Sequence, residues 1–74
     1  MSRDWRAWGA RLKRLRVERG WTQPELAKRV GVTRNAINRL EMGDRKPSIA
    51  LLDRLAEAFR MKPGDLLDMK GFRR

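Results

Sequence analysis

The stretch from residue 23 to residue 41, QPELAKRVGVTRNAINRLE, constrains the fold more than any other part of this chain. Two short helical patterns meet there across Gly31, a residue that readily adopts the positive φ of a tight turn. Thr22 and Glu25 have the T-x-x-E spacing of a capping box, which predicts that the first of the two helices begins here. Pro24 would lie in the first turn, where its missing N–H costs nothing.

The second of these helices is predicted to run from Arg34 to about Met42, with Thr33 as its N-cap. Ile37 and Leu40 would turn toward the core. The opposite face then carries four polar side chains with the i, i+1, i+4, i+5 spacing of a single helix face, namely Arg34, Asn35, Asn38 and Arg39. Arginine and asparagine are side chains that hydrogen-bond to base edges in DNA, so this face is suited to reading a nucleic acid.

The remaining sequence predicts three further helices. Residues 4 to 19 form one apolar face with Trp5, Trp8, Leu12 and Leu15. A helix capped by Ser48 has a broad apolar set, made of Ile49, Leu51, Leu52, Leu55, Ala56 and Phe59, which indicates a central place in the core. A last short helix would open at Pro63 and turn Leu66 and Leu67 inward. We therefore expect an all-α chain: one domain over residues 1–74, a compact five-helix bundle with its core at about 5–68 and a flexible tail at 69–74.

Two positions in the first half of the chain need a local explanation. Gly9 interrupts the first helix at a cost of about 1 kcal/mol relative to alanine, so either the packing is tight there or the turn containing Trp5 is loosely attached. Trp21 lies between the first two helices, and we expect it to plug the core and cap the turn.

The formal charge of the chain is +10, with 19 Lys and Arg against 9 Asp and Glu. The excess lies mostly in residues 1–46, which hold 13 basic and 5 acidic side chains, whereas residues 47–74 hold 6 and 4. A polyanion is the simplest partner for a surface of this kind. The alternative is that Lys and Arg only keep exposed helix faces soluble.

The composition also excludes several classes of site. The chain has no cysteine and no histidine, which rules out disulfides, thiolate or imidazole metal sites and every nucleophile–histidine arrangement. Its serines and threonines fall at helix caps, and its carboxylates are scattered, so we expect neither an enzyme nor a cofactor or metal site. No apolar run approaches the roughly 20 residues that span a bilayer. We expect a cytoplasmic protein with no membrane contact, associated with the nucleoid.

The sequence resembles the helix-turn-helix family of phage repressors and Cro, the Xre family of bacterial regulators. The similarity runs from about Leu12 to Leu67. It rests on Leu12-x-x-Leu15-Arg16, Gly20-Trp21-Thr22-Gln23-x-Glu25-Leu26-Ala27, Gly31-Val32-Thr33 with Ile37, Glu41 and Gly43, and then Pro47-Ser48 with Leu52, Leu55 and Ala56. The resemblance implies a lambda-repressor-like DNA-binding fold, in which the helices cross closely at Ala27 and Gly31 supplies the turn.

The resemblance also implies roles for individual residues. It places base contacts at Arg34, Asn35, Asn38 and Arg39, and phosphate contacts at Gln23, Thr33, Arg45 and Lys46. It further implies an ion pair between Arg16 and Glu41, which we expect to be partly buried. Arg60 stands where relatives usually end a helix with glycine, so we expect a strained or reshaped turn there.

These features predict a sequence-specific, double-stranded-DNA-binding transcriptional regulator, repressor-like and a homodimer on an inverted repeat. No second domain of the kind by which many phage repressors dimerise is apparent, so dimerisation would use the last helices, the tail or the tryptophan end. The alternative is an antitoxin or other protein-interaction module that binds its partner through Trp5, Trp8 or Phe72, with DNA binding serving autoregulation. A third reading is nonspecific binding to nucleic acid through charge alone. The sequence leaves open the operator, the sign of regulation, the regulated gene, any effector or toxin partner, and the dimer surface.

Overall fold

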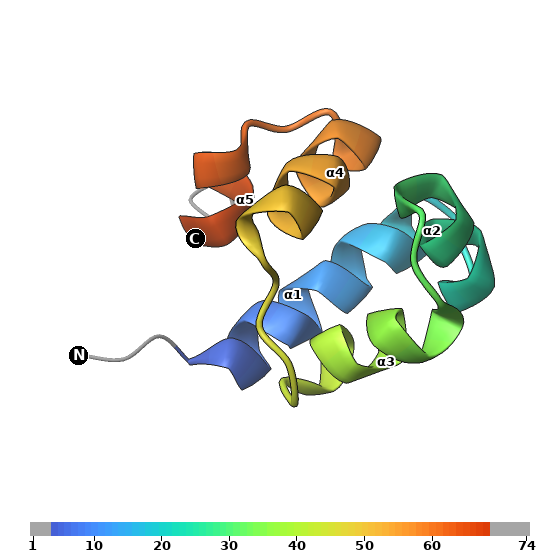
Figure 1. Cartoon of the computed structure of the whole chain (residues 1–74), viewed down its shortest axis with the longest axis horizontal. Helices are drawn as coiled ribbons and strands as arrows, with labels where there is room; N and C mark the ends of the chain where they lie inside the picture. The colour runs from blue at the N-terminus through green and yellow to red at the C-terminus, as the bar shows by residue number, and fades with distance from the viewer. Residues whose placement is uncertain (1–3, 69–74) are drawn as a thin grey trace.

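Five α-helices make up residues 4–68, the part of the chain that the computed structural model describes (Figure 1). Their bounds are Trp5–Glu18 for α1, Gln23–Val30 for α2, Arg34–Met42 for α3, Ile49–Phe59 for α4 and Pro63–Asp68 for α5. Connections of three to six residues join them. The prediction of an all-α, five-helix fold is confirmed, and none of these helices is both long and apolar enough to cross a membrane.

Short polar side chains cap the starts of four helices. Asp4 accepts hydrogen bonds from the backbone N–H groups of Arg6 and Ala7, at 3.1 and 3.2 Å, and so opens α1. Ser48 accepts from the backbone N–H of Leu51 at 3.1 Å and opens α4. Each cap satisfies a backbone donor that has no partner inside the helix, a contribution of about 1 kcal/mol.

The core draws apolar side chains from all five helices. α4 supplies the largest share, in keeping with its predicted central place, through Leu51, Leu52, Leu55, Ala56 and Phe59. The prediction for Ile49 is wrong, because this side chain is 81 % exposed. Ile49 is the first residue of α4, where the helix has only just left the connection from α3 and no neighbouring helix covers its side chain.

Gly9 is where α1 lies directly against α3. A Cβ added at Gly9 would meet the carbonyl oxygen of Leu40 and would approach that of Glu41 to 2.5 Å. Of the two explanations that the sequence allowed, tight packing is therefore the correct one. The two helices approach closely enough for backbone to touch backbone, which fixes the position of α3 relative to α1.

Trp21 covers one end of the core between α1 and α2. Its ring is half-buried and packs on Phe59 with 5.4 Å between ring centroids, and the guanidinium of Arg29 lies 4.2 Å above the indole. Arg19 approaches both rings, at 5.9 Å from Trp21 and 5.3 Å from Phe59. The indole thus packs against the core and has two guanidinium groups within about 6 Å of its ring, which the ring quadrupole attracts.

Arg60 ends α4 in the left-handed conformation, with φ of 58°. It is the only non-glycine residue with positive φ in residues 4–68. The strain that the sequence predicted at this turn is therefore present, since an L-residue with a Cβ disfavours this region.

Candidate nucleic-acid interface

The α2–α3 pair is built by the local signals that its sequence carries. Thr22 Oγ1 accepts from the backbone N–H of Glu25 at 3.2 Å, and the Glu25 carboxylate accepts from the backbone N–H of Thr22 at 2.7 Å. This reciprocal capping box fixes where α2 begins. Gly31 ends α2 with φ of 74°, and Thr33 Oγ1 accepts from the backbone N–H of Ala36 at 3.1 Å to open α3. The two helices and the turn between them form a helix-turn-helix.

The capping box also affects the ionisation of Glu25. The pKa of Glu25 is lowered below its ordinary value. The largest cause is the hydrogen bond from the Thr22 backbone N–H, followed by the hydrogen bond with the Thr22 side chain and by the charge of Arg29. Glu25 therefore remains a carboxylate, and α2 keeps an acceptor at its positive N-terminal end.

The outer face of α3 presents the four polar side chains that the sequence placed there. Arg34, Asn35 and Arg39 are exposed and Asn38 is half-buried, whereas Ile37 and Leu40 on the other side are fully buried. Burial of two apolar side chains against α1 and α2 thus determines which way the polar residues point. Three exposed side chains that can donate hydrogen bonds, and the half-buried amide of Asn38, therefore face outward from one helix.

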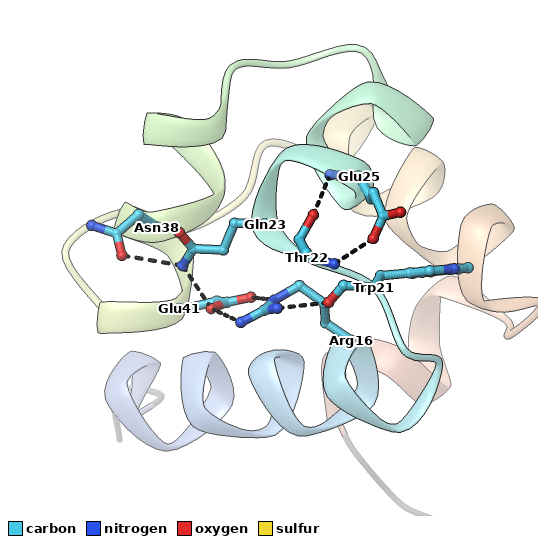
Figure 2. A network of polar contacts seen from close by, with 7 residues as sticks. All are labelled: Arg16, Trp21, Thr22, Gln23, Glu25, Asn38 and Glu41. Carbon is cyan, nitrogen blue, oxygen red and sulfur yellow. Dashed lines mark hydrogen bonds and ion pairs between the residues drawn. The ribbon is translucent and has the colours of Figure 1, made fainter.

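Arg16 and Glu41 tie this helix to α1 through a two-point ion pair (Figure 2). Arg16 Nε lies 2.6 Å from Glu41 Oε2, and Arg16 Nη2 lies 3.2 Å from Glu41 Oε1. Arg16 Nη1 also donates to the backbone carbonyl of Trp21 at 2.7 Å, which holds the segment leading into α2. Both residues are only 8 % exposed. The structure therefore brings together the two residues that the resemblance paired. We expected the pair to be partly buried, and both residues are in fact buried.

Gln23 joins the same cluster from the first residue of α2. Its Nε2 donates to Glu41 Oε1 at 3.0 Å and to Asn38 Oδ1 at 3.2 Å, as Figure 2 shows. The two amide hydrogens are thus both used inside the protein, and the side chain has no donor left for a phosphate oxygen. The backbone N–H of Gln23 donates to no backbone carbonyl within the described residues and stands at the start of α2, a position that favours an anion.

The other residues assigned to phosphate lie at two exposed points beside α3. Thr33 is exposed before the start of the helix, and its hydroxyl keeps a proton to donate while accepting from Ala36. Arg45 and Lys46 are exposed in the connection from α3 to α4, which follows the left-handed Gly43. Cationic or donor groups thus stand at both ends of the exposed face of α3.

Of the residues proposed from sequence as a protein-docking site, one lies in the core. Trp8 is 3 % exposed, and its indole N–H donates to the carbonyl of Leu66 at 3.1 Å, so it is a core residue and not an exposed docking group. Trp5 is half-buried and meets Trp8 edge to face, with 5.6 Å between centroids. Phe72 lies outside the described residues. Three exposed apolar side chains that sequence reasoning did not assign to the surface are Val17, Met42 and Ile49.

The link from Gln23 to Asn38 is the functional contact that sequence reasoning missed. The two residues are fifteen positions apart, on different helices, and their pairing depends on the third residue, Glu41, that both approach. No periodicity in the sequence signals such a contact. The only sequence signal for this contact is that Gln23, Asn38 and Glu41 are all polar and lie on neighbouring helices.

Comparison with known proteins gives a consistent result. The sequence profile of the helix-turn-helix family matches residues 12–66. The HTH-type transcriptional regulator YgzD of Bacillus subtilis is 39 % identical over 56 residues, which cover 76 % of this chain and 85 % of that protein. The restriction-modification controller protein C.AhdI of Aeromonas hydrophila superposes with a TM-score of 0.79 and 33 % identity, over 85 % of this chain and 91 % of its own. The P22 c2 repressor in complex with a synthetic operator superposes with a TM-score of 0.76 and 30 % identity, over 80 % and 89 %.

Proposed function

The chain belongs to the helix-turn-helix family and is a transcriptional regulator of the Xre, or phage-repressor, type; from this premise we propose that it binds double-stranded DNA sequence-specifically through α3. The observation that carries the proposal is the face of α3 made of Arg34, Asn35, Asn38 and Arg39, which points away from a core that holds the helix rigidly. A rigid helix of this kind fits the major groove, where each base pair presents its own pattern of donors and acceptors.

Base contacts come from the side chains of this face. Arg34 and Arg39 each offer the planar donor pair that bridges O6 and N7 of guanine, and Asn35 offers the donor and acceptor that match adenine. Each such pair contributes about 1–3 kcal/mol of discrimination. The Arg16–Glu41 pair acts indirectly, by fixing the position of α3 on the body of the domain.

Phosphate contacts come from groups around the edge of this face. Arg45, Lys46 and the Thr33 hydroxyl are exposed and able to donate, and the backbone N–H of Gln23 lies at the positive end of α2. These contacts fix the position of the domain on the duplex and make the affinity depend on salt.

A homodimer on an inverted repeat is the assembly that fits this domain. The longest dimension of the chain is 31 Å, whereas half-sites one helical turn apart are separated by about 34 Å, so one copy covers one half-site. We also propose that residues 1–74 act as one DNA-binding domain and that the protein works in the cytoplasm at the nucleoid, because its ligand is DNA. Repression by occupying the operator is the simplest action of a domain that binds DNA in this way.

Selection of bound sequences from random DNA, followed by titration of single variants, tests the proposal. We expect a palindromic consensus. Arg39→Ala should weaken the selected site at least tenfold more than scrambled DNA, because it removes a base contact. Lys46→Ala should weaken both equally and lower the slope of log affinity against log salt by about 1. Lys62→Ala, an exposed lysine after α4, is the matched control and should change neither.

Two results would reject this function. Equal losses on selected and scrambled DNA for Arg39→Ala would remove the base-reading role of α3. Failure of the protein to prefer any sequence at about 150 mM salt would leave only binding through charge.

A second function, as a protein-interaction module with autoregulatory DNA binding, is favoured by one observation. Ile49 is 81 % exposed at the start of α4, and Met42 is 58 % exposed at the end of α3, so two apolar side chains face solvent on either side of one connection. Isolation of a stoichiometric complex that Ile49→Glu disrupts, while the DNA affinity of the free domain persists, would support this function. A domain that is purified alone and binds its operator in full would count against it.

A further inference from the structure

The side-chain amide of Gln23 stands between the carboxylate of Glu41 and the amide of Asn38 (Figure 2). Glu41 is paired with Arg16 and is a carboxylate, so its oxygens only accept hydrogen bonds. Gln23 can therefore approach Glu41 Oε1 at 3.0 Å only with its NH2 group. The buried ion pair thus decides which way the Gln23 amide is turned.

This orientation is passed on to Asn38. The second hydrogen of the Gln23 NH2 group points to Asn38 at 3.2 Å, and only the carbonyl oxygen of Asn38 can accept it. Asn38 Oδ1 is consequently held toward α2, and Nδ2 is directed away from Gln23, as Figure 2 shows. The contact of Nδ2 in the described structure is with the sulfur of Met42 at 3.5 Å, a weak acceptor that leaves the group free to donate.

We propose that Gln23 is a positioning residue for base recognition: it holds Asn38 as a hydrogen-bond donor, so that Asn38 recognises a base that presents an acceptor and rejects cytosine. Guanine (N7 and O6), thymine (O4) and adenine (N7) each present an acceptor in the major groove, whereas cytosine presents only its NH2 group there. The pairing of asparagine with adenine N6 and N7 requires the oxygen and the nitrogen of the amide to face the base together, and Gln23 prevents this at Asn38. This inference rests on the proposed function, since it concerns the same face of α3.

Base preference measured at one position tests the inference. Asn38→Ala identifies the position, because preference should disappear there and persist elsewhere. The unaltered protein should disfavour cytosine at that position by about tenfold, the value of one hydrogen bond made or left unmade. Gln23→Met keeps the length of the side chain and removes its donor. The freed Asn38 amide can then turn over, and the preference should fall below about twofold at that position alone.

A second variant keeps the test decisive even if Gln23→Met perturbs α2. Asn38→Asp preserves the acceptor for Gln23 and replaces only the outward NH2 group by an oxygen. It should reverse the preference, favouring cytosine, whose NH2 group donates to the new carboxylate, at the same position. Its negative charge should also weaken binding to all DNA sequences by a common factor. This factor cancels when the affinities for two sequences are divided.

Two outcomes would overturn the inference. The first is a Gln23→Met protein that loses affinity equally on all sequences and keeps its base preference, because Gln23 would then act on phosphate or on packing alone. The second is cytosine selected by the unaltered protein at the position that Asn38→Ala identifies. A protein with no preference at any position would instead reject the proposed function, so the two failures are distinguishable.

Discussion

Arg16 on α1 and Glu41 on α3 form a buried, two-point ion pair, with Nε 2.6 Å from Oε2 and Nη2 3.2 Å from Oε1. The Arg16 side chain is 10 % exposed and the Glu41 side chain 3 %, so water screens the pair little. Glu41 also accepts from Gln23, and Arg16 donates to the Trp21 carbonyl. One carboxylate thus connects the body of the domain to the helix that we propose enters DNA.

Glu41→Gln should lower the free energy of unfolding by about 3 kcal/mol, because it leaves the guanidinium of Arg16 buried without an anion. Such a loss is a large fraction of the total stability of a small domain. Urea unfolding followed by circular dichroism measures the change. Glu57→Gln, on the exposed face of α4, should stay within about 0.5 kcal/mol. An unchanged midpoint for Glu41→Gln would contradict the importance of the pair.

Gly9→Ala should destabilise the protein by about 1–3 kcal/mol, although alanine is the better helix former. The added methyl group would overlap the backbone carbonyls of Leu40 and Glu41, and backbone cannot move aside as a flexible side chain can. Thermal unfolding detects the change.

Gly64 in α5 is the matched control for Gly9. A Cβ added at Gly64 meets no heavy atom within 4 Å, so Gly64→Ala should be neutral or stabilising. If Gly9→Ala were stabilising as well, the close approach of α1 and α3 would be wrong.

The elements of the fold follow from local signals in the sequence. The Thr22 and Glu25 spacing, Gly31, Thr33 and Pro63 each mark a helix boundary at the residue where the structure has it. These signals act within a few residues of chain, and therefore a single sequence contains all of the information needed to interpret them. The exposed face of α3 was predictable for the same reason, since helical periodicity alone places it opposite Ile37 and Leu40.

Contacts between distant segments were not predictable in this way. The sequence allowed two explanations for Gly9, because the deciding neighbour is the backbone of α3. Ile49 shares the apolar period of α4, yet burial depends on which helices reach its first turn. The orientation of the Asn38 amide depends on a chain of hydrogen bonds through Gln23 to Glu41. Helical periodicity identifies which residues share one face of a helix, whereas only the packed structure shows which other elements contact that face.

Glu25→Gln should make stability less dependent on pH in the acid range. The pKa of Glu25 is lowered in the folded protein, chiefly by the hydrogen bond from the Thr22 backbone N–H. A lowered folded-state pKa stabilises the protein above the ordinary pKa of about 4.3, and this contribution is lost as the pH falls through the folded-state value. The unaltered protein should therefore exceed the variant in stability at pH 7 and converge with it toward pH 3. A difference that is the same at both pH values would contradict the assignment.

Arg60→Gly should raise the free energy of unfolding by up to about 1 kcal/mol. Arg60 holds φ at 58°, a conformation that costs an L-residue about 1–2 kcal/mol and glycine almost nothing. Part of this gain is offset because glycine has more conformational freedom in the unfolded chain. Arg60→Ala removes the same exposed side chain but keeps the Cβ, so it should show no gain. Equal stabilisation by both variants in urea unfolding would assign the effect to the loss of positive charge, and not to relief of backbone strain.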